Sequence, residues 1–570
     1  MKCYFVPSDD HEPSDLPDLD EDDDAGSGIT PLSPALLARH GARVLDPSTA
    51  PSAEGWPPPR PTVYRTRTLL VPPRFQRAPY LGAINAVLAR AGMRLVPVAD
   101  HGSDDVDGPL AAIPVTAVLA AADGDGPPAV VDAWTALTAL RTAAVRRDVP
   151  FDRADAERFG LEHLLLGAAI TGSPAVDGSP AVDGSPAVDG SPATSYLSGT
   201  GDARIPVMVY ADAPYRMPAA DCAARYGRRP VIAVPDTGLR AHPWLDVRRA
   251  PPPGRGYVTD VPDGFAQVDQ PMQDAIRAGG QAAAAAGDRA RRPIKDPWDT
   301  PVTANPLVGE LDVATGHGTY IAGIVRQVVP EATVLSIRIM HSDDVVYEGD
   351  LTAALKQLAN RVDQAQDPAN PRPELMVDVV SLSLGYFCES PPDIAYTSGL
   401  KIAIDALLDR GVMVTAAAGN YAVRRRYYPA AFAVAPRPSG TVPLVSVGAL
   451  NPNGTRAMFS DGGRWVTAWA SGAVGVSTFP VDVNGSLTPG AEVPGADGQT
   501  RESLDPDDLS GGWVAWSGTS FAAPALAAWV MRALLEGAAA DPALTLSEPA
   551  PAATASRALH ALRSRGWRER

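Results

Sequence analysis

Apolar and polar positions follow two different patterns along this chain of 570 residues. Between residues 61 and 225, short apolar runs alternate with amphipathic segments, which predicts a small α+β domain. Its expected strands cover 66–72, 93–98, 113–119 and 161–167, its expected helices cover 83–91 and 130–145, and one more strand is expected over 205–210. The order β-α-β-β-α-β is that of a ferredoxin-like domain.

From residue 226 to residue 540, continuous apolar strands alternate with helical segments. This pattern is typical of a mainly parallel sheet with helices on both faces, which is a doubly wound α/β fold. The expected strands cover 231–234, 334–340, 377–384, 412–418 and 444–450, and the expected helices cover 317–329, 351–364 and 394–408.

The other segments are less regular. Residues 1–60 are acidic and then rich in proline, so we expect them to be disordered. The sequence Gly-Ser-Pro-Ala-Val-Asp occurs three times within residues 172–193, followed by an incomplete fourth copy. So few copies are too short for a β-helix, and the repeat is interpreted as a flexible loop or linker. Residues 251–311 and 480–512 are expected to be surface insertions, and 541–570 a C-terminal tail.

Composition excludes some functions. The chain has 49 basic and 66 acidic residues, a net charge of −17, which argues against a nucleic-acid partner. The apolar run Phe521–Met531 ends at Arg532, too short to span a membrane. No secretory signal is recognised, and Cys3, Cys222 and Cys388 are too scattered for a disulfide framework or a metal site. We therefore expect a cytoplasmic protein without a membrane partner.

Candidate chemistry lies at strand ends and helix starts, where α/β sheets place their sites. Asp236 follows a buried strand in Asp-Thr-Gly, His317 stands in Gly-His-Gly-Thr, and Ser520 stands in Gly-Thr-Ser-Phe-Ala-Ala-Pro. Asn420 ends another strand after three alanines and a glycine. Taken singly, each has an ordinary structural interpretation: a turn, a packed histidine, or an N-cap serine. Asp-Thr-Gly is also the motif of aspartic peptidases, but a single copy would require a homodimer.

The order Asp236, His317, Asn420, Ser520, with Gly-His-Gly-Thr and Gly-Thr-Ser-x-Ala-x-Pro, resembles the subtilisin-like serine peptidases (subtilases) over residues 228–535. The resemblance implies a serine endopeptidase with Asp236, His317 and Ser520 as its catalytic triad and Asn420 as oxyanion donor. It also implies that Ser383, Leu384 and Gly385 pair with substrate. The sedolisin relatives replace this His and Asn by Glu and Asp, whereas this chain keeps both. Tyr320 departs from the family, which often has a second His there.

Further expectations follow from this resemblance. The partners are protein or peptide substrates, with the small residues Ala418 and Gly419 lining the substrate site. No cofactor is required; subtilases often carry calcium, but no Asp-x-Asp ligand loop identifies a metal site. The 61–225 domain resembles the family's prodomain and is a candidate intramolecular partner. The alternative is a catalytically silent protein of the subtilisin fold with a binding or regulatory role.

Overall fold

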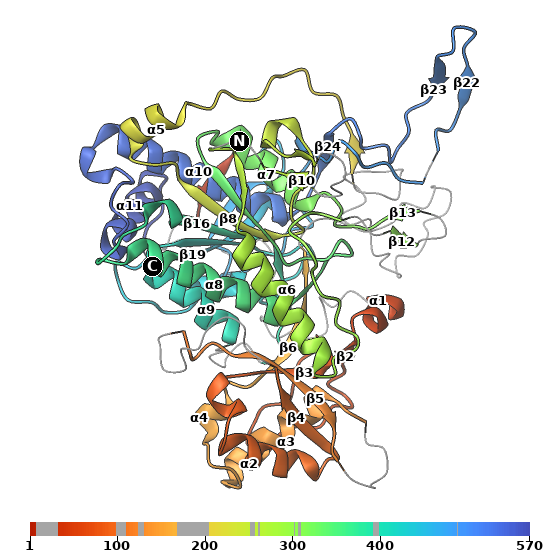
Figure 1. Cartoon of the computed structure of the whole chain (residues 1–570), viewed down its shortest axis with the longest axis vertical. Coiled ribbons are helices and arrows are strands. Elements are labelled where there is room, and N and C mark those ends of the chain that lie inside the picture. The colour runs from red at the N-terminus through yellow and green to blue at the C-terminus, as the bar shows by residue number, and fades with distance from the viewer. Residues whose placement is uncertain are drawn as a thin grey trace.

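The computed structural model describes residues 1–6, 32–98, 110–123, 130–167, 204–250, 257–259, 263–300, 303–305, 309–390, 398–486 and 488–569. Figure 1 shows a large upper body and a smaller lower lobe. The lower lobe, called here the N-terminal domain, comprises the described residues from 34 to 167. The upper body, called here the α/β domain, is built from the described residues after 203 and a strand at the start of the chain. The predicted repeat at 172–193 lies outside the described residues.

The N-terminal domain has the predicted element order. It consists of β3 (Thr62–Val71), α2 (Tyr80–Ala89), β4 (Met93–Pro97), β5 (Val115–Ala121), α3 (Ala133–Arg146) and β6 (Gly160–Gly167). The strands form an antiparallel sheet in the order β4-β5-β3-β6, the ferredoxin-like arrangement. Its core contains Leu69 of the sheet, Leu137 of α3, Phe75 of a short 3-10 helix and Phe159, which directly precedes β6.

A sheet of eight strands forms the centre of the α/β domain, in the order β11-β14-β8-β16-β18-β19-β20-β1. The strands are β11 (Ala266–Val268), β14 (Thr333–Arg338), β8 (Val231–Asp236), β16 (Val379–Leu382), β18 (Met413–Ala417), β19 (Leu444–Leu450), β20 (Ala468–Ser471) and β1 (Cys3–Phe5). All neighbours are parallel except β1 with β20. This is the predicted doubly wound α/β fold. After β8, the chain adds β11 and β14 on one side of β8 and then β16 to β20 on the other side, so the direction of winding reverses at β8.

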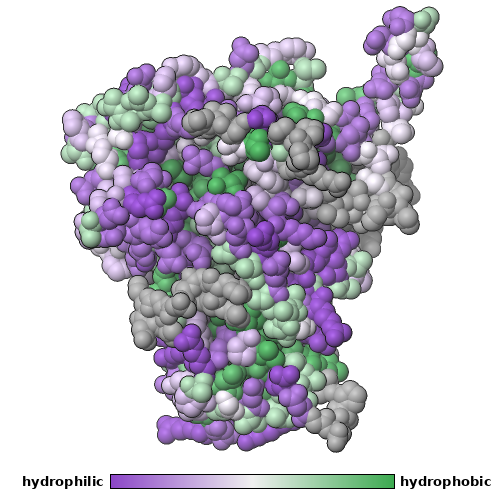
Figure 2. All heavy atoms as spheres, in the orientation of Figure 1, coloured by the Kyte–Doolittle hydropathy of each residue, from purple (hydrophilic) through white to green (hydrophobic). Residues whose placement is uncertain are grey.

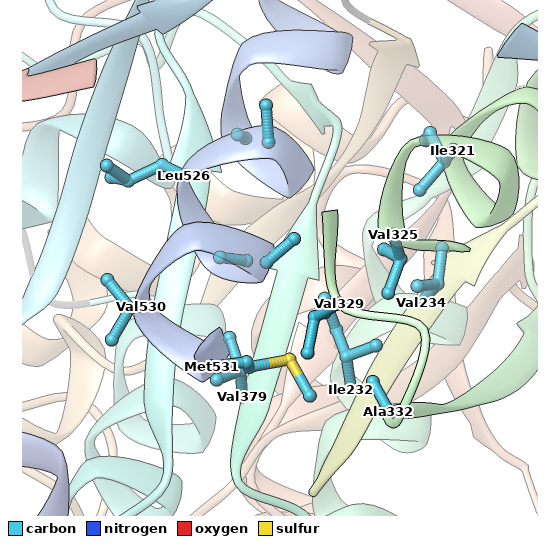
Figure 3. Close-up of a cluster of buried hydrophobic side chains, with 14 of the residues drawn as sticks. Ile232, Val234, Ile321, Val325, Val329, Ala332, Val379, Leu526, Val530 and Met531 are labelled. Atoms are coloured by element: carbon cyan, nitrogen blue, oxygen red, sulfur yellow. The ribbon is translucent and has the colours of Figure 1, made fainter. Parts of the chain in front are cut away.

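Helices cover both faces of this sheet. On one face lie α7 (His317–Val328) and α10 (Thr519–Ala540), and on the other lie α6 (Gln270–Ala285), α8 (Glu348–Gln366) and α9 (Gly399–Asp409). Figure 3 shows Ile321 and Val325 of α7, Leu526 and Val530 of α10, and Ile232 of β8 in one apolar cluster. Neighbouring positions of β8 point to opposite faces, since Ile232 and Val234 join this cluster and Ala233 joins the other. This two-sided burial explains the continuous apolar strands.

Several predictions made for the irregular segments are wrong. Cys3–Phe5 is not disordered, because it pairs with β20 at the edge of the central sheet. Downstream, α1 (Pro34–Arg39) and β2 (Ala42–Leu45) extend the N-terminal domain. The strand β1 is only three residues long and its partner β20 lies far away in the chain, so no local pattern predicted it.

The expected boundaries also change. The segment 251–311 is not only a surface insertion, since it supplies β11 and the helix α6, which packs on α8. The expected strand at 205–210 shrinks to β7 (Ile205–Pro206), which pairs with β24 (Trp513–Trp516) of the α/β domain. In the expected tail, α11 (Pro551–Ser564) packs on α10. Within 480–512, the hairpin of β22 (Glu492–Pro494) and β23 (Thr500–Glu502) projects from the body (Figure 1).

Helix α10 is long and apolar enough to cross a membrane by length and composition, but 83% of its most apolar window is buried inside the protein. The apolar side chains of α10 instead pack against α7 and the central sheet, as part of one core. Figure 2 shows hydrophilic residues over much of the face of the upper body, with apolar residues scattered between them.

Candidate active site

The structure brings Asp236 and His317 together. Asp236 is the last residue of β8 and His317 the first residue of α7. Nδ1 of His317 lies 2.8 Å from Oδ1 and 3.0 Å from Oδ2 of Asp236. The Asp-Thr-Gly motif is therefore engaged with a histidine, which argues against the aspartic peptidase alternative.

Both glycines beside His317 are required by close packing. A Cβ on Gly316 would lie 2.3 Å from the ring of Phe479, and Gly316 has a φ of +81° that favours glycine. A Cβ on Gly318 would lie 2.3 Å from the carbonyl oxygen of Gly238. The start of α7 can approach the Asp236 loop only without these side chains, which explains Gly-His-Gly.

The surroundings of His317 favour its charged form. Burial alone would lower the pKa of His317, but the charge and the hydrogen bond of Asp236, followed by the charges of Asp344 and Asp299, outweigh it and raise that pKa. The imidazole packs against the rings of Trp516 and Phe521, at centroid distances of 5.7 and 5.4 Å. Among the described residues, His317 Nε2 has no hydrogen-bond partner.

Ser520 is held at the start of α10 by two reciprocal hydrogen bonds with Ser383. Ser520 Oγ donates to the carbonyl oxygen of Ser383 at 3.1 Å, and Ser383 Oγ donates to the carbonyl oxygen of Ser520 at 2.8 Å. Pro524 permits the second bond, because it lacks the N–H that would normally bond to the carbonyl four residues earlier. Pro524 lies beyond the first turn of α10 and leaves the carbonyl oxygen of Ser520 free to accept this bond.

Asn420 is anchored to the residue before Ser520. Its Oδ1 accepts hydrogen bonds from the backbone N–H of Thr519 at 3.0 Å and from Thr519 Oγ1 at 2.9 Å. Thr519 Oγ1 also lies 3.1 Å from the backbone nitrogen of Gly419, which donates to it. These bonds fix the amide oxygen beside the start of α10, and none of them uses the donor group Nδ2.

The predicted substrate edge is already paired with the chain itself. The short strand β17 (Leu384–Gly385) pairs antiparallel with β6, with Leu384 opposite Gly167 and Gly385 opposite Leu166. On its other side, β6 pairs antiparallel with β15 (Val345–Tyr347). The C-terminal end of β6 is therefore the middle strand between β15 and β17, which both belong to the α/β domain.

Ala418 and Gly419, which are expected to form a wall of the substrate site, have an acidic neighbour. Both residues are buried, and a Cβ on Gly419 would lie 2.1 Å from Oδ2 of Asp461. Asp461 also accepts hydrogen bonds from the backbone nitrogens of Tyr421 and Val423. The wall is thus shaped by a buried carboxylate that the sequence pattern did not reveal.

Two further carboxylates near His317 were missed. Asp299, from the expected insertion, accepts a hydrogen bond from the backbone nitrogen of Gly316 at 2.7 Å, and burial raises the pKa of Asp299 to about 6. Burial raises the pKa of Asp344 to about 7. Neither lies in a recognisable motif, so only the folded structure identifies them.

Other candidate features are structural. Tyr320, at the unusual position in the motif, is buried against Trp516 and Phe521 and donates a hydrogen bond to the carbonyl of Gly475. Within the described residues, no group of three or more His, Cys, Asp or Glu side chains could hold a metal ion.

Comparison with known proteins identifies the family. The profile of the subtilase family matches residues 227–547, more than half of the chain. The chain belongs to the subtilase family. Thermitase of Thermoactinomyces vulgaris is 29% identical over 183 residues, which span 30% of this chain and 55% of thermitase. Subtilisin-like protease 3 of Pseudogymnoascus destructans is 28% identical over 174 residues, spanning 30% of this chain and 37% of that protein.

The similarity therefore spans only about half, or less, of these relatives. Among solved structures, a cold-adapted subtilisin-like serine proteinase matches 56% of this chain and 79% of its own at 18% identity, with a TM-score of 0.32.

Proposed function

We propose that this protein is a serine endopeptidase that cleaves peptide bonds through an acyl-enzyme intermediate. The observation that carries the proposal is the hydrogen bond between Asp236 and His317, in a subtilase-family chain whose Ser520 lies at a helix start. The helix start supplies backbone N–H groups and a positive dipole end for a developing negative charge.

In this mechanism, Ser520 Oγ leaves the carbonyl of Ser383 and gives its proton to His317 Nε2 as it attacks a peptide carbonyl carbon. Asp236 holds the imidazole tautomer and stabilises the imidazolium. The oxyanion of the tetrahedral intermediate accepts hydrogen bonds from Asn420 Nδ2 and from the Ser520 backbone N–H. His317 then returns the proton to the leaving amine, and water reverses the sequence to release the acid.

A fluorophosphonate probe tests the nucleophile, because it bonds covalently to an activated serine oxygen. We expect labelling of the full chain at Ser520, loss of labelling in Ser520→Ala, and strong reduction in His317→Ala. The modified residue is mapped by mass spectrometry of peptides. Labelling elsewhere, or equal casein cleavage by Ser520→Ala, would remove Ser520 as the nucleophile. Absence of both labelling and cleavage in the full chain would favour the catalytically silent alternative.

We infer that the N-terminal domain is an intramolecular partner that restrains this site. Support comes from the pairing of β6 with β17, since a substrate peptide would need the same backbone groups of Ser383–Gly385. A tethered segment competes at a high effective concentration.

Buried charges supply a second support for this docking. Arg65 of β3 makes two hydrogen bonds to Asp288, at 2.6 and 2.9 Å, and a third to Glu162 of β6. Arg291 of the α/β domain pairs with the same Glu162 at 3.2 Å. Buried, hydrogen-bonded charges of this kind tolerate little displacement, because separation leaves them unpaired away from water.

A further inference from the structure

The end of β6 follows the path of a peptide that approaches Ser520. Leu166 lies opposite Gly385 and Gly167 opposite Leu384, and Gly167 donates a backbone hydrogen bond to the carbonyl oxygen of Asp344 at 3.2 Å. Continued in the same register, the next residue of a bound peptide would lie opposite Ser383, the partner of Ser520. Gly167 therefore lies where a bound substrate would place its second residue before the bond to be cleaved.

Gly167 has no room for a side chain. A Cβ built on it would lie 2.1 Å from Oδ1 and 3.0 Å from Cγ of Asp344, and 3.3 Å from Cε of Met340. In the same strand, a Cβ on Gly160 would meet nothing within 4 Å. The restriction thus belongs to the cleft at Gly167 and not to the strand in general.

The backbone of Asp344 directs its carboxylate toward this position. Asp344 has a φ of +72°, a left-handed conformation that Asp, Asn and Gly tolerate best. It lies in a turn in which its N–H donates to the carbonyl of His341 at 3.0 Å, and His341 N–H donates to the carbonyl of Val345 at 2.9 Å. Asp344 is only 8% exposed, and its Oδ1 has no hydrogen-bond partner in the described part of the chain.

We propose that Asp344 is a specificity-determining residue: it excludes side chains from the substrate residue that takes the place of Gly167. The substrates are then peptides with glycine as the second residue before the cleaved bond. This inference rests on the proposed peptidase function and concerns the same cleft.

The test is cleavage of a peptide mixture varied at this position, with products identified by mass spectrometry. We expect the full chain to cleave glycine peptides at least about tenfold faster than alanine peptides, a ratio typical of one excluded methyl group. Asp344→Gly keeps the left-handed backbone and removes the obstacle, so its glycine-to-alanine ratio should fall near one. Asp344→Asn keeps the size without the charge and should keep the preference.

Three results would overturn the inference: an unchanged ratio in Asp344→Gly, loss of the preference in Asp344→Asn, or faster cleavage of lysine or arginine peptides than of glycine peptides. Absence of any Ser520-dependent cleavage, also when Arg65→Ala undocks β6, would contradict the proposed function instead.

A second measurement does not depend on activity. In the full chain carrying Ser520→Ala, Gly167→Ala should speed amide hydrogen exchange in β6 at least about tenfold, because overpacking loosens the strand. Gly160→Ala is the matched control and should not. Adding Asp344→Gly to Gly167→Ala should restore slow exchange, and failure of this rescue would refute the steric role of Asp344.

Discussion

His317 faces three carboxylates, which act on it over different distances. Burial by itself would lower the pKa of His317, but Asp236, Asp344 and Asp299 together raise it. Asp236 does so through its charge and a direct hydrogen bond, and the other two do so through their charge. The imidazole of His317 is therefore held in its protonated form to a higher pH than an ordinary histidine.

The pH dependence of activity should reflect this. A protonated imidazole cannot accept the serine proton, so kcat/KM rises as His317 loses its proton; we expect the rising limb above about pH 6.5, the ordinary histidine pKa. Asp299→Asn removes one negative charge and should move this limb to lower pH. The check is a pH profile with a fluorogenic peptide, and Asp296→Asn, in the same loop, is the control. A limb that stays in place in Asp299→Asn would contradict this reasoning.

Asn420→Ala should lower kcat far more than it changes KM, because the oxyanion exists only after attack. We expect a loss of about 10²–10³-fold, the range known for removal of one such donor in subtilisin itself. Asn420→Asp keeps the acceptor that Thr519 uses and removes the donor, so it separates catalysis from folding. Steady-state kinetics of both variants at neutral pH provide the measurement, and an unchanged kcat would remove Asn420 from the mechanism.

At the scale of elements, β6 joins the two domains. It is an edge strand of the N-terminal sheet and also the middle strand between β15 and β17. Its polar residues Glu162 and His163 point to charged partners from the α/β domain. Docking therefore combines backbone pairing with buried charge, and either part can be tested separately.

Arg65→Ala should undock β6, because it leaves Asp288 and Glu162 buried with one fewer cation. Loss of one partner from a buried ion pair typically costs about 3–5 kcal/mol. We expect faster hydrogen exchange in β6 and faster cleavage of a small peptide. Arg67→Ala is the control, since Arg67 is exposed on the same strand. Faster exchange without faster cleavage would show that β6 does not restrain the site.

His163 should make docking sensitive to alkaline pH. It lies 2.6 Å from Glu348 and 2.9 Å from Glu389, and its ring stacks on Tyr386. Burial would lower the pKa of His163, but the two glutamates outweigh it and raise that pKa to about 9. Because the folded-state pKa is raised, this stabilisation is fully present below about pH 6.5 and is lost as pH rises through about 9.

The measurement is hydrogen exchange of β6 between pH 6 and pH 10, corrected for the intrinsic rate. Exchange should accelerate across this window in the full chain. His163→Gln cannot take up the proton and should flatten the dependence. An equally steep dependence in His163→Gln would assign the effect to another group.

At the scale of the whole molecule, the chain begins in the α/β domain with β1, continues through the N-terminal domain, and then forms the rest of the α/β domain. Phe5 of β1 is 7% exposed and stacks on Trp529 of α10, at a centroid distance of 6.4 Å. In Figure 1 the N-terminus lies in the upper body, away from the N-terminal domain that follows it in sequence. The first strand is therefore a second attachment of the N-terminal part to the α/β domain.

Cleavage between the domains should consequently leave them associated. With a site for a sequence-specific protease inserted into the repeat at 172–193, in the chain carrying Ser520→Ala, we expect the nicked halves to co-elute in size exclusion. Denaturant should separate them. Phe5→Asp combined with Arg65→Ala removes both attachments and should release the N-terminal half under native conditions. Separation of the singly nicked chain without these substitutions would contradict this prediction.

The sequence by itself determined the features that depend on local pattern. Alternating strands and helices predicted the doubly wound sheet, because strands buried on both faces must be apolar throughout, as Val231–Val234 is. The order β-α-β-β-α-β of the N-terminal domain followed from the same periodicities. Asp236, His317, Asn420 and Ser520 could be selected because glycines and small residues around them form recognisable motifs, although their roles remain our proposal.

Only the tertiary structure decided which distant segments meet. Cys3–Phe5 carries no strand signal of its own, since its pairing comes from β20, more than 460 residues later. Asp299 and Asp344 lie in irregular segments, and the proximity of both to His317 depends on how the chain folds back. Pairing of β6 with β17 is likewise set by the docking of two domains. Such contacts follow from packing and buried charge between remote residues, and a local pattern holds no information about them.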